Sequence, residues 1–418
     1  MPPSHFIKFN KQRTLPECYW FLSFAAKESK TEVEFIEKIE TILLSAVKRR
    51  MVSDVPLGAF LSGGIDSSLV VAMMATVSDF PVKTFSIGYK DEHFDELKYA
   101  RMVAEKYSTD HHEFIVAPDA IGILPEIVWS YGEPFSDSSQ IPTYYVAKMT
   151  RQKVTVALSG DGGDEAFGGY GLARAHYMGY YYRKYLPSYL GNTLLPSVAD
   201  ALVTMAGKRG RGLISKIKTL TEYGKGEFCD TFYLLMDVFG FELRDSLYTA
   251  EFKHQLSGHT PIDPLKKCIS DADGTNEVDK WLYIDIKNYL PNDILTKVDV
   301  ATMMNSLEAR SPFLDYQLLE YAARIPSKLK LKFGIQKYLL KKLAEKLIPH
   351  DIIYRPKQGF SIPLRSWIMD NFKLLIEAIL FSDRALKRGY FKVDFVRRLA
   401  EEHSSGKHDH SQRIWALL

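Results

Sequence analysis

The sequence predicts an α/β fold in which a parallel β-sheet with helices on both faces is followed by a mostly helical C-terminal region. Up to about residue 170, short apolar segments alternate with segments of helical periodicity, and two of the apolar segments run directly into glycine-rich loops. Strands separated by helices of this length favour a parallel sheet. Beyond residue 170 the alternation stops. We therefore divide the chain into an N-terminal strap (1–30), an alternating core (31–170) and a helical part (171–418).

Composition and charge indicate a soluble globular protein with no nucleic-acid or membrane partner. Hydrophobic residues make up 46% of the 418 residues, charged residues make up 25%, and the formal net charge is only +3. No apolar run approaches the ~18 residues of a membrane span, and the N-terminus lacks a signal-peptide pattern. The cysteines, Cys18, Cys229 and Cys268, are odd in number and far apart. We therefore expect reduced core thiols in a cytoplasmic protein.

The predicted elements follow from periodicity and from end signals. Ser29 with Glu32, and Thr31 with Glu34, each fit a capping box at the start of a helix that ends near Arg50. The core then alternates. We expect strands at 57–61, 82–89, 113–116 and 154–158, and helices at 66–77, 94–107, up to about 130, and 142–150.

The flanking parts carry weaker signals. Residues 18–24 could be a short strand or an apolar strap, and 256–278 look like a loop-rich connection. Helices are expected at 278–289, 295–306 and 337–347, with Lys297 and Asp299 on the second of them. Residues 308–315 combine charges with a proline-ended helix, which either an ion pair in a helical core or a substrate contact would explain.

The stretch 57–68 has the layout of an anion-binding loop: an apolar strand, two glycines and the start of a helix. Gly63 and Gly64 let the backbone come close to a ligand, and free N–H groups at a helix N-terminus attract anions. Asp66 beside phosphates makes sense if Mg²⁺ bridges them. The Gly-Lys-Ser/Thr ending of the Walker loop and the Gly-x-Gly-x-x-Gly spacing of the dinucleotide fingerprint are both missing. The alternative is an ordinary strand-to-helix turn with a capping Asp.

A second glycine-rich loop follows the strand at 154–158. After Ser159 and Gly160, the carboxylates of Asp161, Asp164 and Glu165 fall within five residues. Unpaired, they would repel one another and raise their own pKa values. Beside Mg²⁺ and an incoming amine, one could ligate the metal and another could take a proton. The alternative is an acidic surface turn. Because strands of a parallel sheet end at one edge, both loops are expected there.

Three other stretches are ambiguous. The strand end 84–88, which includes Ile87, could expose its backbone to an adenine ring or could be a plain strand end. The loop Glu133–Ser139 carries several polar groups at the same sheet edge, but by itself is only a turn. The histidines His403, His408 and His410 could suggest a metal site, but they lie in a polar stretch near the C-terminus, which argues against one.

The motif Ser-Gly-Gly-x-Asp-Ser at 62–67 resembles the pyrophosphate loop of the ATP pyrophosphatase (PP-loop) superfamily. Both loops, with Ser-Pro-Phe-Leu-Asp at 311–315 and Arg-Pro-Lys-Gln-Gly-Phe at 355–360, resemble the synthetase domain of glutamine-hydrolysing asparagine synthetases, in the same order over nearly the whole chain. The resemblance implies a Rossmann-like core similar to adenine nucleotide alpha hydrolases. It also implies that ATP and Mg²⁺ activate the side-chain carboxylate of L-aspartate as an acyl-adenylate, which releases pyrophosphate, and that ammonia then forms asparagine and AMP.

The resemblance also assigns roles to residues. Lys337 falls where the family has a lysine that stabilises the adenylation transition state. Asp161 falls where asparagine-forming members often have Glu, proposed to help deprotonate ammonia, and Glu165 is a further catalytic candidate. Gly132 stands where similar proteins have an acidic residue. Asp66 and Asp164 would ligate Mg²⁺. The residues expected to hold ATP are Leu61, Ser62, Gly63, Gly64, Asp66, Ser67, Ser68, Ile87, Ser159 and Gly160.

The front of the chain departs from the family, whose members carry an N-terminal glutaminase domain with a cysteine nucleophile after Met1. Here Pro2 follows Met1. We therefore expect free ammonia as the nitrogen source, or a separate glutaminase, or a fragment or split gene; the end at Leu418 also looks early. Two alternatives stay open. One is the same chemistry on another carboxylate, such as a sugar uronic acid or a peptide. The other is a non-catalytic nucleotide-binding partner of a glutaminase.

Overall fold

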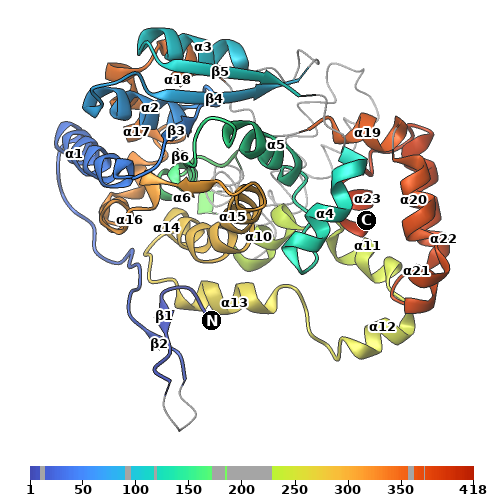
Figure 1. The fold of residues 1–418 in the computed structure, drawn as a ribbon. Coiled ribbons are helices and arrows are strands. Elements are labelled where there is room, and N and C mark those ends of the chain that lie inside the picture. Colours follow the sequence, from blue (N-terminus) through green and yellow to red (C-terminus); the bar gives the residue numbers. More distant parts are fainter. Residues whose placement is uncertain are drawn as a thin grey trace, which may run out of the picture.

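The centre of the molecule is a five-stranded parallel sheet with the strand order β5-β4-β3-β6-β7 (Figure 1). The computed structural model describes residues 1–9, 15–89, 96–116, 120–171, 184–185, 228–355, 362–370 and 372–418. Helices flank the sheet and the C-terminal region is helical, which confirms the predicted fold class. The strands are β3 (Leu57–Phe60), β4 (Lys83–Gly88), β5 (Asp110–Ile115), β6 (Val156–Leu158) and β7 (Glu308–Arg310).

The strand order reverses between β3 and β6. From β3 the chain builds outward through β4 to β5, and then returns to place β6 on the other side of β3. Ala59 of β3 pairs with Thr84 of β4 on one side and with Leu158 of β6 on the other. In open parallel sheets, ligands bind beyond the carboxyl ends of the strands at such a reversal. The two glycine-rich loops follow β3 and β6, so the prediction that they share one sheet edge is confirmed.

The fifth strand, β7, is a correction to the sequence analysis. We expected a proline-ended helix at 308–315, explained by an ion pair in a helical core or by a substrate contact, whereas Ala309 pairs in parallel with Ala157 of β6. The segment has three residues, two of them charged, and lies at the sheet edge, so it carries no apolar alternation. Its end residue Arg310 donates from Nη1 to the carbonyls of Arg50 and Val52, at 3.0 and 2.7 Å. A strand from beyond residue 170 therefore completes the sheet.

The helices of the core lie close to their predicted positions. Thr31 and Glu34 form the capping box of α1, while the alternative box at Ser29 is not used. Helix α2 is buried along Ser67–Met74, as expected for a helix enclosed by its neighbours. The predicted start of the third helix at residue 94 lies outside the described residues. The helices are α1 (Glu32–Met51), α2 (Ile65–Val77), α3 (Leu97–Lys106), α4 (Ala120–Tyr131), α5 (Gln140–Thr150) and α6 (Gly163–Phe167).

In the helical part, the predicted helices at 278–289 and 295–306 form one continuous helix with a π-helical segment in the middle. A helix at 263–271 corrects the expected loop-rich connection, and a helix does run from 338 to 347 as predicted. The elements are α10 (Phe228–Met236), α11 (Gly240–Leu247), α12 (Ala250–Gln255), α13 (Asp263–Asp271), α14 (Glu277–Ile284), the π segment η3 (Asp285–Ile294), α15 (Leu295–Met303), the 3₁₀ turns η4 (Pro312–Leu314) and η5 (Ser327–Leu329), α16 (Tyr316–Arg324), α17 (Tyr338–Leu347) and α18 (His350–Ile353).

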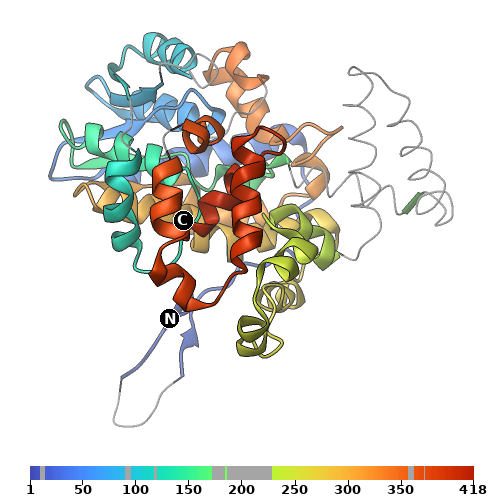
Figure 2. The same cartoon turned by 90° about the vertical axis from the view of Figure 1, so that its right-hand side faces the viewer.

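The last helices stand on the side of the molecule opposite α1 (Figures 1 and 2). They enclose a second apolar core with α4 and α5, in which Trp415 packs near Phe372 and Ile141. They are α19 (Leu364–Asp370), α20 (Lys373–Leu380), α21 (Asp383–Arg388), α22 (Val393–Ser404) and α23 (Ser411–Leu417).

The N-terminal strap runs from a projecting arm onto the body of the protein (Figure 2). The arm carries the short pair β1 (His5–Phe6) and β2 (Glu17–Cys18). Beyond it, Leu22 and Phe24 are buried, and the Phe24 N–H donates to Asp273 at 2.8 Å. Residues 19–24 are thus an apolar strap and not a strand. Cys18 is exposed, so the expectation of a core thiol is wrong there, although none of the three cysteines forms a disulfide.

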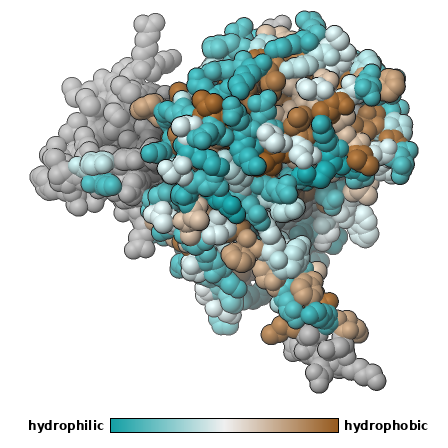
Figure 3. Space-filling model, turned by 90° about the vertical axis from the view of Figure 1, so that its left-hand side faces the viewer, coloured by the Kyte–Doolittle hydropathy of each residue, from teal (hydrophilic) through white to brown (hydrophobic). Residues whose placement is uncertain are grey.

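The surface seen from the left of Figure 1 is mostly hydrophilic, with apolar residues scattered over it and more of them on the arm (Figure 3). Single exposed apolar residues are normal for globular proteins. Within the described part of the chain, no helix has the length and apolar character needed to cross a bilayer.

A buried lysine, Lys330, lies beneath the strap. It is 1% exposed, and its Nζ stands 5.0 Å from the centre of the Phe24 ring and has no hydrogen-bond partner. Burial lowers the pKa of Lys330 to about 7, although the charge of Asp279 opposes this shift. Because the folded-state pKa lies below the usual 10.5, the fold favours the neutral amine. Protonation therefore destabilises the folded state as the pH falls from about 10 towards 7.

We predict that K330M is more stable than the native chain at pH 7, by on the order of a few kcal/mol. A methionine keeps the volume and removes the buried amine. The native Tm should rise between pH 7 and 10 more steeply than that of K330M, as measured by scanning fluorimetry. K328M, which changes an exposed lysine of the same segment, should leave the pH profile as it is. A K330M profile that parallels the native one would contradict the assignment.

Candidate active site

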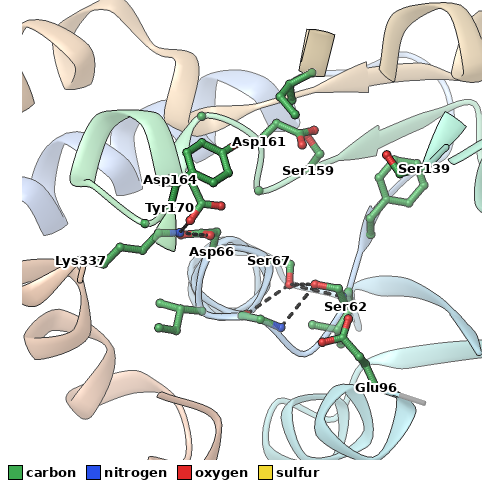
Figure 4. Close-up of a pocket in the computed structure, with 18 of the residues that line it drawn as sticks. Ser62, Asp66, Ser67, Glu96, Ser139, Ser159, Asp161, Asp164, Tyr170 and Lys337 are labelled. Carbon is green, nitrogen blue, oxygen red and sulfur yellow. Dashed lines mark hydrogen bonds and ion pairs between the residues drawn. The ribbon is translucent and has the colours of Figure 1, made fainter. Parts of the chain in front are cut away.

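A pocket of about 870 Å³ opens at the carboxyl edge of the sheet, between the two glycine-rich loops and the helical part (Figure 4). Most of the residues singled out from the sequence line it. Gly63 and Ser68 do not: Gly63 packs against α3, and Ser68 is fully buried within α2. The predicted residues that line the pocket are Leu61, Ser62, Gly64, Asp66, Ser67, Ile87, Ser159, Gly160, Asp161, Asp164, Glu165 and Lys337.

The first loop has the features of an anion cradle. Gly64 is the N-cap of α2 and supplies no side-chain cap, so the first N–H groups of this 13-residue helix are left for a ligand. The hydroxyls of Ser62 and Ser67 lie 3.0 Å apart, and the Gly64 N–H donates weakly to Ser62 Oγ at 3.4 Å. These donors point into the pocket together, so the loop can accept a phosphate group.

The second loop packs directly on the start of α2. A Cβ added to Gly160 would lie 2.7 Å from the backbone nitrogen of Ser67 and 2.9 Å from Asp66 Cβ. Only glycine allows so close an approach. The contact brings the carboxylates of the second loop beside Asp66, which belongs to the first.

A lysine from the helical part joins the two loops. The Lys337 ammonium forms ion pairs with Asp164 Oδ1, at 2.7 Å, and with Asp66 Oδ2 (Figure 4). Lys337 is 5% exposed and is the N-cap of α17, in a left-handed conformation at φ 52°. That conformation costs a non-glycine residue ~1–2 kcal/mol. Burial alone would lower the pKa of Lys337, but the two carboxylates raise it above its usual value. The lysine is therefore charged.

Asp66 and Asp164 fit a Mg²⁺ site. Their carboxylates already converge on one cationic atom, the Nζ of Lys337. One or two carboxylates together with substrate phosphates are the ligand set that Mg²⁺ uses in nucleotide sites. Within the described residues, no group of three or more His, Cys, Asp or Glu side chains forms a complete metal cage. The arrangement thus suits a metal that arrives with a phosphate ligand.

Burial raises the pKa values of two further carboxyls of the second loop, Glu165 and Asp161. Glu165 is 1% exposed, accepts a hydrogen bond from the Tyr170 hydroxyl at 2.6 Å, and has no partner at Oε2. Burial, reinforced by the charge of Asp164, raises the pKa of Glu165 to about 7. Burial also raises the pKa of Asp161, against a hydrogen bond from Ser159. A carboxyl that titrates near neutrality can exchange a proton with an incoming amine.

The wall nearest the helical part carries a charge cluster around Lys297, which is buried. Its ammonium donates to Asp137 Oδ2 at 2.7 Å, and Asp137 also accepts from the N–H and hydroxyl of Ser139. These bonds and the charge of Lys297 hold the pKa of Asp137 below its usual value despite burial. Burial and the charge of Asp137 raise the pKa of Asp293, in η3, to about 6. One cation therefore faces several carboxyls here.

Sequence reasoning missed several lining residues. Asp137 lies in the loop 133–139, whose polar residues and position at the sheet edge were the available signal. Lys297 was noted on its helix without a role, while Asp299 beside it is exposed. Glu96, Tyr289 and Arg355 line the pocket, but the first two stand in no motif. Tyr289 reaches the pocket from the π segment, which periodicity did not reveal.

Comparison with known proteins agrees with this geometry. The family model described as "Asparagine synthase" matches residues 38–418. The chain is similar to asparagine synthetase [glutamine-hydrolyzing] 1 of Bacillus subtilis, at 34% identity over 93% of this chain and 58% of the relative. It is similar to a putative asparagine synthetase of Mycobacterium bovis, at 33% identity over 91% of this chain and 56% of the relative. It is also similar, at 25% identity, to amidase chyE of Penicillium rubens, over 88% of this chain and 58% of that relative. The chain thus spans 50–58% of the length of these and other curated relatives.

The lysine between the two aspartates leads to a stability prediction. In K337M, Asp66 and Asp164 would face each other without a cation, which should cost about 3–5 kcal/mol in the presence of a chelator. Mg²⁺ should restore more stability to K337M than it adds to the native protein, because a divalent cation can take the place between the carboxylates. Tm measured with chelator and with Mg²⁺ checks both statements.

K346M serves as a matched control, because Lys346 is an exposed lysine of the same helix, paired loosely with Glu40 at 3.7 Å. Its Tm should match that of the native protein under both conditions. If Mg²⁺ shifted K337M and the native protein equally, the carboxylates would not be a shared cation site.

Proposed function

The chain belongs to the asparagine synthase family, and we propose that it is an ATP-dependent ligase that converts a carboxylate to an amide. The observation that carries the proposal is the convergence of three features in one pocket: the phosphate-binding loop before α2, the carboxylates Asp66 and Asp164, and the buried Lys337 between them. We also propose a cytoplasmic location, consistent with three cysteines that form no disulfide.

The proposed reaction has two steps. A carboxylate oxygen of the substrate attacks the α-phosphorus of ATP, pyrophosphate leaves, and an acyl-adenylate forms. Ammonia then attacks the acyl carbon, a proton is lost from nitrogen, and AMP leaves. The first step builds negative charge on the phosphate, so preorganised donors and cations beside it lower the barrier.

Different residues of the chain would take part in different steps of this reaction. The N–H groups at the start of α2 and the hydroxyls of Ser62 and Ser67 would bind the pyrophosphate portion. Lys337 would pair with the phosphate oxygens where charge develops. Asp66 and Asp164 would hold Mg²⁺, which when bound neutralises phosphate charge. Glu165, whose pKa is raised to about 7, would accept the proton from the attacking ammonia, with Asp161 as its neighbour in the same loop.

The wall around Lys297 favours L-aspartate as the acyl substrate. An amino acid presents an α-carboxylate and an α-ammonium group in addition to the carboxylate that reacts. Lys297 can pair with the first, and the carboxyls of Asp137, Asp293 and Asp161 can pair with the second. A sugar uronic acid has no ammonium group to offer, and an internal peptide residue has neither group free. The second step consumes ammonia, which the assay below supplies as ammonium chloride.

The test of the proposed function is pyrophosphate release from ATP and Mg²⁺ with ammonium chloride, with and without L-aspartate. We expect aspartate-dependent release together with asparagine and AMP. D66N should reduce release at least 100-fold, because it removes a carboxylate from the cation site, and should fold normally. Pyrophosphate release only with another carboxylic acid would support the ligase reaction and rule out L-aspartate as its substrate. No release with any acid would favour a non-catalytic nucleotide-binding protein.

The role of Lys297 gives a separate prediction. K297M should raise KM for aspartate roughly 10- to 100-fold, the effect of losing one charged hydrogen bond, while KM for ATP stays near the native value. The double variant D137N/K297M also removes the charge of Asp137, the carboxylate that pairs with Lys297, and should show the same KM change with a smaller loss of stability than K297M. K148M, an exposed lysine on α5, is the control. An unchanged KM for aspartate in the double variant would show that Lys297 does not bind aspartate.

A further inference from the structure

Arg355 is a cation of the pocket wall to which the proposed chemistry assigns no task. It follows α18, and its side chain is 11% exposed. Its Nη2 donates to Glu96 Oε1 at 2.6 Å and to the carbonyl oxygen of Gly63 at 3.2 Å. Its guanidinium carbon lies 4.4 Å from the centre of the Tyr99 ring. A planar guanidinium with a carboxylate, a carbonyl and an aromatic face around it is held in one orientation.

The carbonyl that Arg355 contacts belongs to the phosphate-binding loop. Gly63 has φ +68°, and a Cβ on it would lie 2.6 Å from Tyr99 Cβ and 2.7 Å from the nitrogen of Ala100. The residue is therefore pressed against the first turn of α3. Of the loop residues 61–67, Gly63 is the one that does not line the pocket. Its carbonyl faces Arg355 and α3 instead.

This contact decides where the next N–H points. The C=O of one residue and the N–H of the following residue lie on opposite sides of a planar trans peptide. With the Gly63 carbonyl turned towards Arg355, the Gly64 N–H is turned the other way, towards the Ser62 hydroxyl and the pocket. A flipped peptide between these two glycines would point a carbonyl oxygen at the phosphate and remove a donor.

Arg355 also affects the local charge. Glu96, the N-cap of α3, lines the pocket near the loop. A lone carboxylate there would repel the phosphates of an incoming nucleotide. The ion pair with Arg355 neutralises it, with both side chains largely buried.

From these contacts we propose that Arg355 is a positioning residue, which holds the Gly63–Gly64 peptide so that the Gly64 N–H faces the bound pyrophosphate, and which neutralises Glu96. The inference rests on the proposed function in one respect: the anion at the loop is the pyrophosphate portion of ATP. Arg355 acts through the loop and not by contact with the reacting atoms.

The test uses ligand-free crystal structures and binding of Mg²⁺–pyrophosphate by calorimetry, for the native protein, R355A and R355K. We expect the Gly63 carbonyl to face Arg355 in the native crystal and to leave this orientation in R355A. We expect pyrophosphate to bind R355A roughly 10- to 100-fold more weakly, the effect of losing a charged hydrogen bond, while adenosine binds as before. Millimolar guanidinium should restore pyrophosphate affinity to R355A by filling the site, and ethylammonium should not.

R101A is the matched control, because Arg101, in α3, forms an ion pair of the same kind with Glu113, at 2.6 Å, but its side chain is half-exposed. It should bind pyrophosphate like the native protein. A native peptide orientation in R355A would overturn the inference, and so would equal losses in R355A and R101A. If R355A does not fold, R355K decides by the same two measurements. If the native protein binds neither ATP nor pyrophosphate, the proposed function fails, and the peptide orientation still decides the role of Arg355.

Discussion

A single lysine ammonium between two aspartate carboxylates connects three parts of the chain that are far apart in sequence. Asp66 begins α2, Asp164 belongs to the loop after β6, and Lys337 begins α17. A buried pair of like charges is unfavourable without a cation, so the helical part is needed to stabilise the loops of the core. The left-handed conformation of Lys337 shows how strictly this position is constrained. The same three groups face the phosphate-binding loop. The interaction that stabilises the site therefore also places a cation and two carboxylates beside the loop.

The sheet topology explains why these groups meet. Because the strand order reverses between β3 and β6, the loops after these strands diverge around a crevice at the carboxyl edge. The glycines of both loops then permit contact distances that a side chain would forbid. The π segment η3 turns Tyr289 towards the crevice, and α15 places Lys297 on its wall. The pocket thus has a phosphate side built by the core and a second charged side built by the helical part.

The parts of this structure that sequence could predict are those whose information is local. The strands at 57–60 and 156–158, the capping box at Thr31 and the two acidic glycine-rich loops each lie within a dozen residues of sequence. Lys337 could be proposed only through resemblance to a family, because nothing around it signals chemistry. Glu96 and the pairing of Asp137 with Lys297 depend on tertiary packing and carry no pattern, and Arg355 stands in a motif that does not reveal its contact with Gly63. Strand β7 was missed because an edge strand of three residues needs no apolar alternation. The catalytic and metal-binding roles stay predictions.

Lys337 is synthesised long after Asp66, and this order affects how the chain folds during translation. Lys337 follows Asp66 by 271 residues, and Ser311, just after β7, follows its partner Asp161 by 150. Ribosomes add roughly 5–20 residues per second, so roughly 15–50 seconds separate the synthesis of Asp66 from that of Lys337. During that interval the emerging core has an unpaired edge on β6, which favours association with other chains. Its folding during translation can therefore finish only after the helical part has left the ribosome, and the edge of β6 stays exposed until then.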